Sequence, residues 1–266
     1  MSQKKLGLYA YCIVNTRPPA GEAGLKISAR GGPASGWDQL GINDKHKVYP
    51  ISYKNLSALV SQVSLSDFGE REIKKNLKDM EWTKKMVVAH EMIVETLMKT
   101  CQPLLPMKFC TIFKGNKQVE GILKNRYVEF RQTLSRLKDK EEWGIKMYGK
   151  IPAEGKAKRK SSKGADYLLL RKKEDEIEKK AEQEMMRNAN KVHRQLEKYA
   201  FSSVVSDLLP KKATGKTSEM MLNTAYLVPK EKLTEFKDES KRLQEEYGKL
   251  GFEINFTGPW PPYNFL

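Results

Sequence analysis

The chain has 266 residues, of which 39% are hydrophobic and 31% are charged. This length and apolar content allow one large domain or two of ordinary size, and they exclude a disordered tail. The formal net charge of +16 favours an acidic partner, and it leaves open whether that partner is nucleic acid, anionic lipid or protein.

The first predicted element is a β-strand over residues 6–14, which is apolar on both faces and therefore buried on both sides. Simple alternation places Leu8, Ala10 and Cys12 on one face, and Tyr9 and Tyr11 on the other. The rest of this half predicts a long Gly- and Pro-rich loop over 17–47, strands over 48–53, 56–63 and 104–113, and helices over 70–100 and 116–137.

The second half of the chain predicts a regular order of elements. Strands are expected over 143–148, 201–207, 220–228 and 252–257, helices over 166–200 and 230–249, and basic loops over 150–164 and 208–218. The order β-α-β-β-α-β is that of a ferredoxin-like domain. We therefore expect an α+β protein with an N-terminal domain over 1–140, a ferredoxin-like domain over 141–257 and a tail over 258–266. At about 1.5 Å per residue, the first of these helices is longer than a small domain.

The sequence contains partial catalytic motifs, none of which is complete. Gly215-Lys216-Thr217 resembles the end of a phosphate-binding loop, but Pro210 occupies the position of the required first glycine. His90-Glu91 begins a zinc-protease pattern, but Val94 replaces the second histidine, so we interpret His90 as a hydrogen-bonded structural residue.

The cysteines and histidines are too few and too scattered for other chemistry. Three widely spaced cysteines form neither a disulfide framework nor a Cys-x-x-Cys metal pair, and they fit a reducing cytoplasm. Three scattered histidines add no metal-ligand spacing. We expect no enzyme, no catalytic residue, no metal and no cofactor. No apolar run approaches the roughly 20 residues of a membrane span, so we expect no membrane partner.

Two segments are candidates for binding a partner. The first is a basic run that contains Lys156, Lys158, Arg159 and Lys160. Such a run could neutralise phosphates, but the aromatic-basic signature of an RNA-binding sheet is absent, so a nucleic-acid-binding module is the alternative function.

The second candidate is the closing segment, in which prolines at 259, 261 and 262 stiffen a chain that carries Trp260, Tyr263 and Phe265. A stiff aromatic segment loses little entropy when it docks. Packing against its own protein is the favoured interpretation, and contact with a partner is the alternative.

Six short stretches occur in an order that is typical of one family. They are LYAYCI at 8–13, Trp82 with His90-Glu91, LPMKFCTIF at 105–113, EEWGIKM at 141–147, YL at 167–168 and TGPWPPYNF at 257–265. Together they resemble the gas vesicle protein F/L family. Lys108-Phe109-Cys110 and the basic middle of the chain favour the L type, whereas the segments 17–45 and 150–163 match no motif of that family.

The resemblance implies a cytoplasmic, non-catalytic accessory protein or minor component of the gas vesicle. It implies two α+β domains, the second of them ferredoxin-like. The expected partners are the small hydrophobic shell subunit and other accessory proteins, which such a protein would bind while it assists nucleation of the shell.

Overall fold

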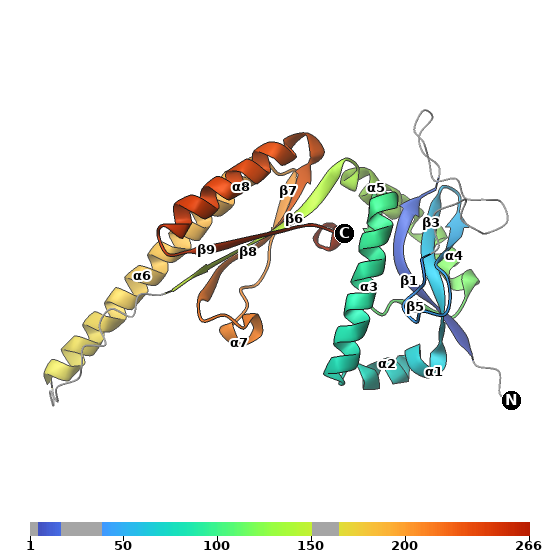
Figure 1. Ribbon diagram of the computed structural model, residues 1–266, viewed down its shortest axis with the longest axis horizontal. Helices are drawn as coiled ribbons and strands as arrows, with labels where there is room; N and C mark the ends of the chain where they lie inside the picture. Colours follow the sequence, from blue (N-terminus) through green and yellow to red (C-terminus); the bar gives the residue numbers. More distant parts are fainter. Residues whose placement is uncertain (1–4, 17–38, 151–164) are drawn as a thin grey trace. The chain divides into compact units, whose positions relative to one another are not determined.

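The computed structural model describes residues 5–16, 39–150 and 165–266 (Figure 1). The chain divides into two compact units. The first unit contains Met1–Asp139 together with Pro261–Leu266, and the second contains Lys140–Trp260. Most of the first predicted loop and almost all of the basic loop over 150–164 lie outside the described residues.

The first unit is built on an antiparallel sheet with the strand order β2-β3-β1-β4, in which β5 also pairs with β1. The strands are β1 (Leu6–Asn15), β2 (Tyr49–Tyr53), β3 (Leu56–Ser64), β4 (Leu104–Pro106) and β5 (Ile112–Phe113). The helices are α1 (Leu65–Phe68), α2 (Glu70–Asn76), α3 (Met80–Thr100), α4 (Asn116–Asn125) and α5 (Tyr127–Leu137). Helix α3 packs on one face of the sheet, and α4 and α5 pack on the other (Figure 1).

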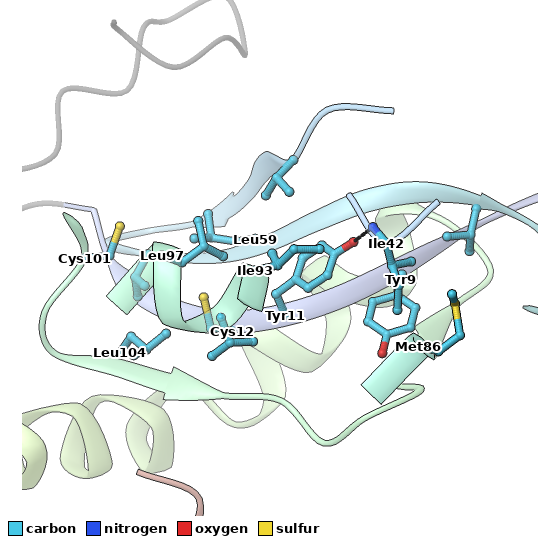
Figure 2. Close-up of a cluster of buried hydrophobic side chains, with 14 of the residues drawn as sticks. Tyr9, Tyr11, Cys12, Ile42, Leu59, Met86, Ile93, Leu97, Cys101 and Leu104 are labelled. Atoms are coloured by element: carbon cyan, nitrogen blue, oxygen red, sulfur yellow. Dashed lines mark hydrogen bonds between the residues drawn. The ribbon is translucent and has the colours of Figure 1, made fainter. Parts of the chain in front are cut away.

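Strand β1 lies in the middle of this sheet and is buried on both faces, as its sequence predicts. The predicted alternation is wrong beyond Ala10, because a β-bulge at Tyr11 shifts the register against β3. Tyr11 and Cys12 therefore both contribute to the core on the α3 side (Figure 2). Ile13 instead packs on the side of α4 and α5. The bulge places the Tyr11 hydroxyl where it accepts a hydrogen bond from the Ile42 N–H at 2.8 Å (Figure 2).

Three predicted elements of this half are each divided in two. The expected helix over 70–100 is interrupted before Asp79, whose carboxylate caps α3 by accepting from the N–H groups of Glu81 and Trp82. The helix over 116–137 breaks at Arg126, between α4 and α5. The strand over 104–113 becomes β4 and β5, because a turn with Cys110 at φ 61° separates them.

The second unit has a four-stranded sheet with the order β7-β8-β6-β9, in which all neighbours are antiparallel. The strands are β6 (Lys140–Gly149), β7 (Ser202–Val205), β8 (Glu219–Pro229) and β9 (Glu253–Trp260). The helices are α6 (Ala165–Glu197), α7 (Lys211–Thr214), η1 (Lys230–Lys232) and α8 (Leu233–Gly248). The predicted order of major elements is observed, with the short α7 added in the loop over 208–218.

Helices α6 and α8 pack on the same face of this second sheet, and only part of α6 contributes to the core (Figure 1). Its second half buries a stripe from Met185 to Leu196, whereas Ile177 is 53% exposed. The sequence stripe alone does not distinguish these halves, because both carry apolar residues at helical spacing.

The last strand is longer than predicted. Strand β9 continues through Gly258 and Pro259 to Trp260, so only the final six residues leave the sheet. Those residues contain a short 3-10 helix, η2 (Tyr263–Phe265), and belong to the first unit.

Candidate functional site

The predicted partner-binding residues are distributed over both units and over a segment outside the described residues. Lys156, Lys158, Arg159 and Lys160 lie outside the described residues. Trp260 ends β9 in the second unit, is 41% exposed, and donates from Nε1 to the Thr257 hydroxyl at 3.0 Å. Tyr263 and Phe265 belong to the first unit.

The closing residues pack against the first unit itself. Phe265 is only 6% exposed, and both Pro261 and Pro262 are buried. The Arg136 guanidinium donates to the backbone carbonyl of Phe265 and so ties the end of the segment to α5. In this arrangement Phe265 contributes to the protein's own interior and offers little surface to another molecule.

Tyr263 is held by a buried hydrogen-bond network around His90, which we call the His90 network. His90 is fully buried on α3, with Nδ1 at 3.0 Å from the Tyr9 hydroxyl and Nε2 at 3.1 Å from the Tyr263 hydroxyl. The Cys110 N–H donates to the same Tyr9 hydroxyl at 2.9 Å. The prediction of a hydrogen-bonded structural histidine is therefore confirmed.

These partners assign the tautomer of His90. Because the Tyr263 hydroxyl donates its proton to the Glu91 carboxylate, its oxygen accepts from Nε2–H of His90, and Nδ1 is left to accept from the Tyr9 hydroxyl. The Tyr263 hydroxyl in turn bonds to the Glu91 carboxylate. The network therefore joins β1, α3 and the closing segment in one continuous series of donors and acceptors.

Burial controls the charge of this network. Desolvation lowers the pKa of His90 to about 4, so the imidazole is neutral at physiological pH. Desolvation raises the pKa of the Glu91 carboxyl, and the hydrogen bond from Tyr263 opposes that rise. A neutral imidazole without exposed surface joins elements of the fold and has no contact with solutes.

The remaining reactive side chains form no catalytic arrangement within the described parts of the chain. Burial raises the pKa of Cys101 and of Cys110 to about 11, and it raises that of Cys12 further, so all three remain thiols. Among the described residues, no group of three or more His, Cys, Asp or Glu side chains is placed to hold a metal ion.

The Gly-Lys-Thr sequence is not a phosphate cradle in this fold. Gly215 ends the one-turn helix α7 in the left-handed region, at φ 69°. Lys216 is already bound, because its Nζ lies 2.5 Å from a carboxylate oxygen of Glu253 and over the ring of Tyr148. Lys216 therefore connects this loop to β9 and β6 of the second sheet.

None of the helices that the structure describes combines the length and the apolar character that crossing a bilayer requires.

Comparison with known proteins identifies the family. The family model for the gas vesicle synthesis proteins GvpL and GvpF matches residues 7–266, which is nearly the whole chain. The chain belongs to the GvpL/GvpF family. Its role is therefore related to gas vesicles, and the resemblance seen in the sequence motifs is confirmed.

Relatives of both GvpL and GvpF type match most of the chain. Gas vesicle protein L of Streptomyces sp. is 26% identical over 221 residues, which cover 81% of each chain. Gas vesicle protein F1 of Halobacterium salinarum is 27% identical over 231 residues, which cover 86% of this chain and 85% of the relative. Because these identities are nearly equal, the assignment to the L type stays a prediction.

Solved GvpF structures share the fold. The crystal structure of GvpF from Anabaena sp. PCC7120 superimposes with a TM-score of 0.67 at 18% identity, covering 98% of this chain and 95% of that chain. GvpF from Microcystis aeruginosa gives a TM-score of 0.63 at 19% identity, covering 97% and 98%. The mixed α+β architecture with two sheets is thereby confirmed.

Sequence reasoning missed what the His90-Glu91 pair does in this fold. The pair and the closing Tyr263 belong to two separate family motifs, and no spacing rule connects positions 173 residues apart. The available signal was that both motifs combine a polar group with apolar neighbours, which is typical of a buried polar contact.

Proposed function

We propose that this chain is a non-catalytic accessory protein of gas vesicle assembly that binds the small hydrophobic shell subunit and other accessory proteins. Membership of the GvpL/GvpF family over residues 7–266 is the observation that carries the proposal. The buried, neutral His90 and the protonated cysteines support it, because neither offers a reactive group to a substrate.

The physical role follows from the chemistry of the partner. An apolar shell subunit that exposes contiguous apolar surface associates with its own copies before it reaches a growing shell. A folded protein that covers this surface slows off-pathway association and releases the subunit to the assembling wall. The net charge of +16 draws acidic accessory proteins by long-range attraction, and apolar contact then holds them.

We further infer that the second unit is a ferredoxin-like module and that the protein works in the cytoplasm. The antiparallel order β7-β8-β6-β9, with α6 between β6 and β7 and α8 between β8 and β9, supports the fold assignment. The three cysteines, which remain free thiols, support a reducing compartment.

Co-expression with the shell subunit tests the proposal. The tagged chain is captured at about 50 mM and at about 500 mM salt, and the shell subunit bound to it is measured. A basic protein of similar net charge serves as the control, since it reproduces electrostatic attraction alone. We expect the shell subunit to stay bound to this chain at both salt concentrations and to leave the control at the higher one.

Two results would contradict the proposal. One is no capture of the shell subunit at either salt concentration. The other is normal gas vesicle formation in cells that lack this chain and every close relative of it.

A further inference from the structure

Strand β7 (Ser202–Val205) forms one edge of the second sheet, and we call this strand with the preceding Phe201 the β7 edge (Figure 1). Among the residues that the structure describes, β7 pairs only with β8. Its sequence, Ser-Ser-Val-Val, contains neither a charge nor a proline. Natural sheet edges usually carry such residues, because a bare edge can pair with another chain.

Three other edge strands show this protection. Strand β2 contains Pro50, β4 contains Pro106 and β9 contains Pro259, and a proline removes one backbone donor from an edge. The remaining edge strand, β5, has only two residues. Among the described edge strands, β7 is thus the one that is longer than two residues and lacks a proline. It also contains Val204 and Val205, whose β-branched side chains favour strands.

The pairing of β7 determines which of its backbone groups point away from the sheet. Ser206 N–H donates to the Asn223 carbonyl, while Val205 lies opposite Thr224 in the register. Antiparallel strands alternate inward and outward groups, so residues 202, 204 and 206 bond to β8. The N–H and C=O groups of Ser203 and Val205 therefore point outward and can receive a further strand.

Apolar side chains lie beside these outward groups. Val205 is 60% exposed and lies on the same face of the strand as Ser203. Phe201 is 56% exposed, and the Lys140 ammonium lies over its ring. The Ser203 hydroxyl donates to Glu197 of α6, so this is the face that the helices cover. Leu208 and Leu209, just after the strand, are 44% and 41% exposed. An incoming strand would meet both free backbone groups and apolar surface.

We propose that the β7 edge docks an extended apolar segment of the shell subunit, which adds as a fifth strand to the second sheet. This inference rests on the proposed function and names the surface that performs it. Outward backbone groups in a row select an extended chain over a helix or a small ligand. A second copy of this chain is disfavoured because two chains of +16 repel each other, whereas a neutral or acidic segment is not repelled.

Proline at position 205 tests the docking. Val205→Pro deletes one outward N–H and leaves the inward groups of residues 202, 204 and 206 in place. Val205→Thr is the matched control, because it keeps both the N–H and the β-branched shape. A second variant, Val205→Lys, keeps the N–H but places a charge on the edge. Thermal unfolding of each variant reports whether the second unit remains folded.

The readouts are capture of the co-expressed shell subunit and amide hydrogen exchange at Ser203 and Val205. We expect Val205→Pro and Val205→Lys to reduce capture about tenfold and Val205→Thr to stay within about twofold of the wild type. We also expect the Val205 amide of the wild type to exchange more slowly once the subunit is bound.

Two outcomes overturn the docking in distinguishable ways. If the wild type and both disruptive, folded variants capture the subunit equally, the β7 edge is not the docking surface and the proposed function stands. If the wild type itself captures no shell subunit, the proposed function fails and the docking fails with it.

Discussion

His90 Nε2 lies 3.1 Å from the Tyr263 hydroxyl, although 173 positions of the sequence separate the two residues. This contact joins α3 to the closing segment inside one compact unit. A buried polar group that loses its partner costs more than the bond itself contributes, so the contact makes the position of the closing segment specific.

Removing the Tyr263 hydroxyl measures that contact. We expect Tyr263→Phe to lower the free energy of unfolding by about 1–2 kcal/mol, because Nε2–H of His90 and the Glu91 carboxylate both lose a partner. Urea denaturation gives the value. Tyr199→Phe is the control, since the Tyr199 hydroxyl has no hydrogen-bond partner among the described residues, and it should change the value by less than about 0.5 kcal/mol. Equal effects of the two substitutions would contradict the His90 network.

Acid should destabilise the first unit through His90. Its pKa is about 4 in the folded chain and about 6.5 when unfolded, so the unfolded chain binds the proton first. The free energy of unfolding therefore falls as the pH drops from about 6.5 towards 4, by up to roughly 3 kcal/mol. Glu91 works in the opposite direction, because a carboxyl with a raised pKa gains its proton more readily in the folded chain.

The variant His90→Gln isolates this contribution. Glutamine does not titrate, so its stability curve should be flatter than that of the wild type between pH 4 and 6.5. Urea denaturation at several pH values gives both curves. Parallel curves for the two proteins would show that His90 keeps an ordinary pKa in the fold.

Gly258 is required by close packing at the end of β9. A Cβ atom there would meet the Trp143 ring at 2.9 Å and the Glu142 carbonyl at 3.0 Å, and φ is 134°. We expect Gly258→Ala to lower the free energy of unfolding by roughly 2 kcal/mol. Gly248→Ala is the matched control, because no heavy atom lies within 4 Å and the helix favours alanine. Thermal denaturation of both variants measures the difference, and Gly248→Ala should be neutral or slightly stabilising.

Cys110 has a left-handed backbone, with φ at 61°. Such a backbone costs an L-residue about 1–2 kcal/mol, and a glycine avoids the cost. We therefore expect Cys110→Gly to leave stability unchanged or raise it by up to about 1 kcal/mol, after the larger chain entropy of glycine is included. Cys110→Val should lower it by more than 1 kcal/mol, since branching at Cβ worsens the strain. A valine variant as stable as the glycine variant would contradict the assigned conformation.

Local sequence patterns predicted most of the secondary structure. The apolar run of β1 and the helical stripe of α3 each depend on residues close in the chain, so periodicity identified them. The Tyr11 bulge was not predictable in the same way, because it depends on the register against β3. The break before Asp79 had a local signal, since aspartate is a favoured N-cap.

The candidate sites were harder to predict than the elements. The aromatic closing segment was recognised, but the sequence left open whether Tyr263 and Phe265 face a partner or the protein itself. That choice depends on the buried His90 and on Arg136, both on distant helices. The β7 edge was missed because an edge is a property of strand order, and strand order is not written in the sequence of one strand.

The pairing of Glu142 with Trp260 has a kinetic consequence. These residues lie near the two ends of the second unit, and the chain on either side of that unit forms the first unit. Closing a loop of on the order of 100 residues costs roughly 4 kcal/mol of chain entropy. Once β6 and β9 are paired, that cost has already been met, and the closing segment is present at high effective concentration beside α5. We therefore expect the pairing of β6 with β9 to precede the docking of the closing segment on α5.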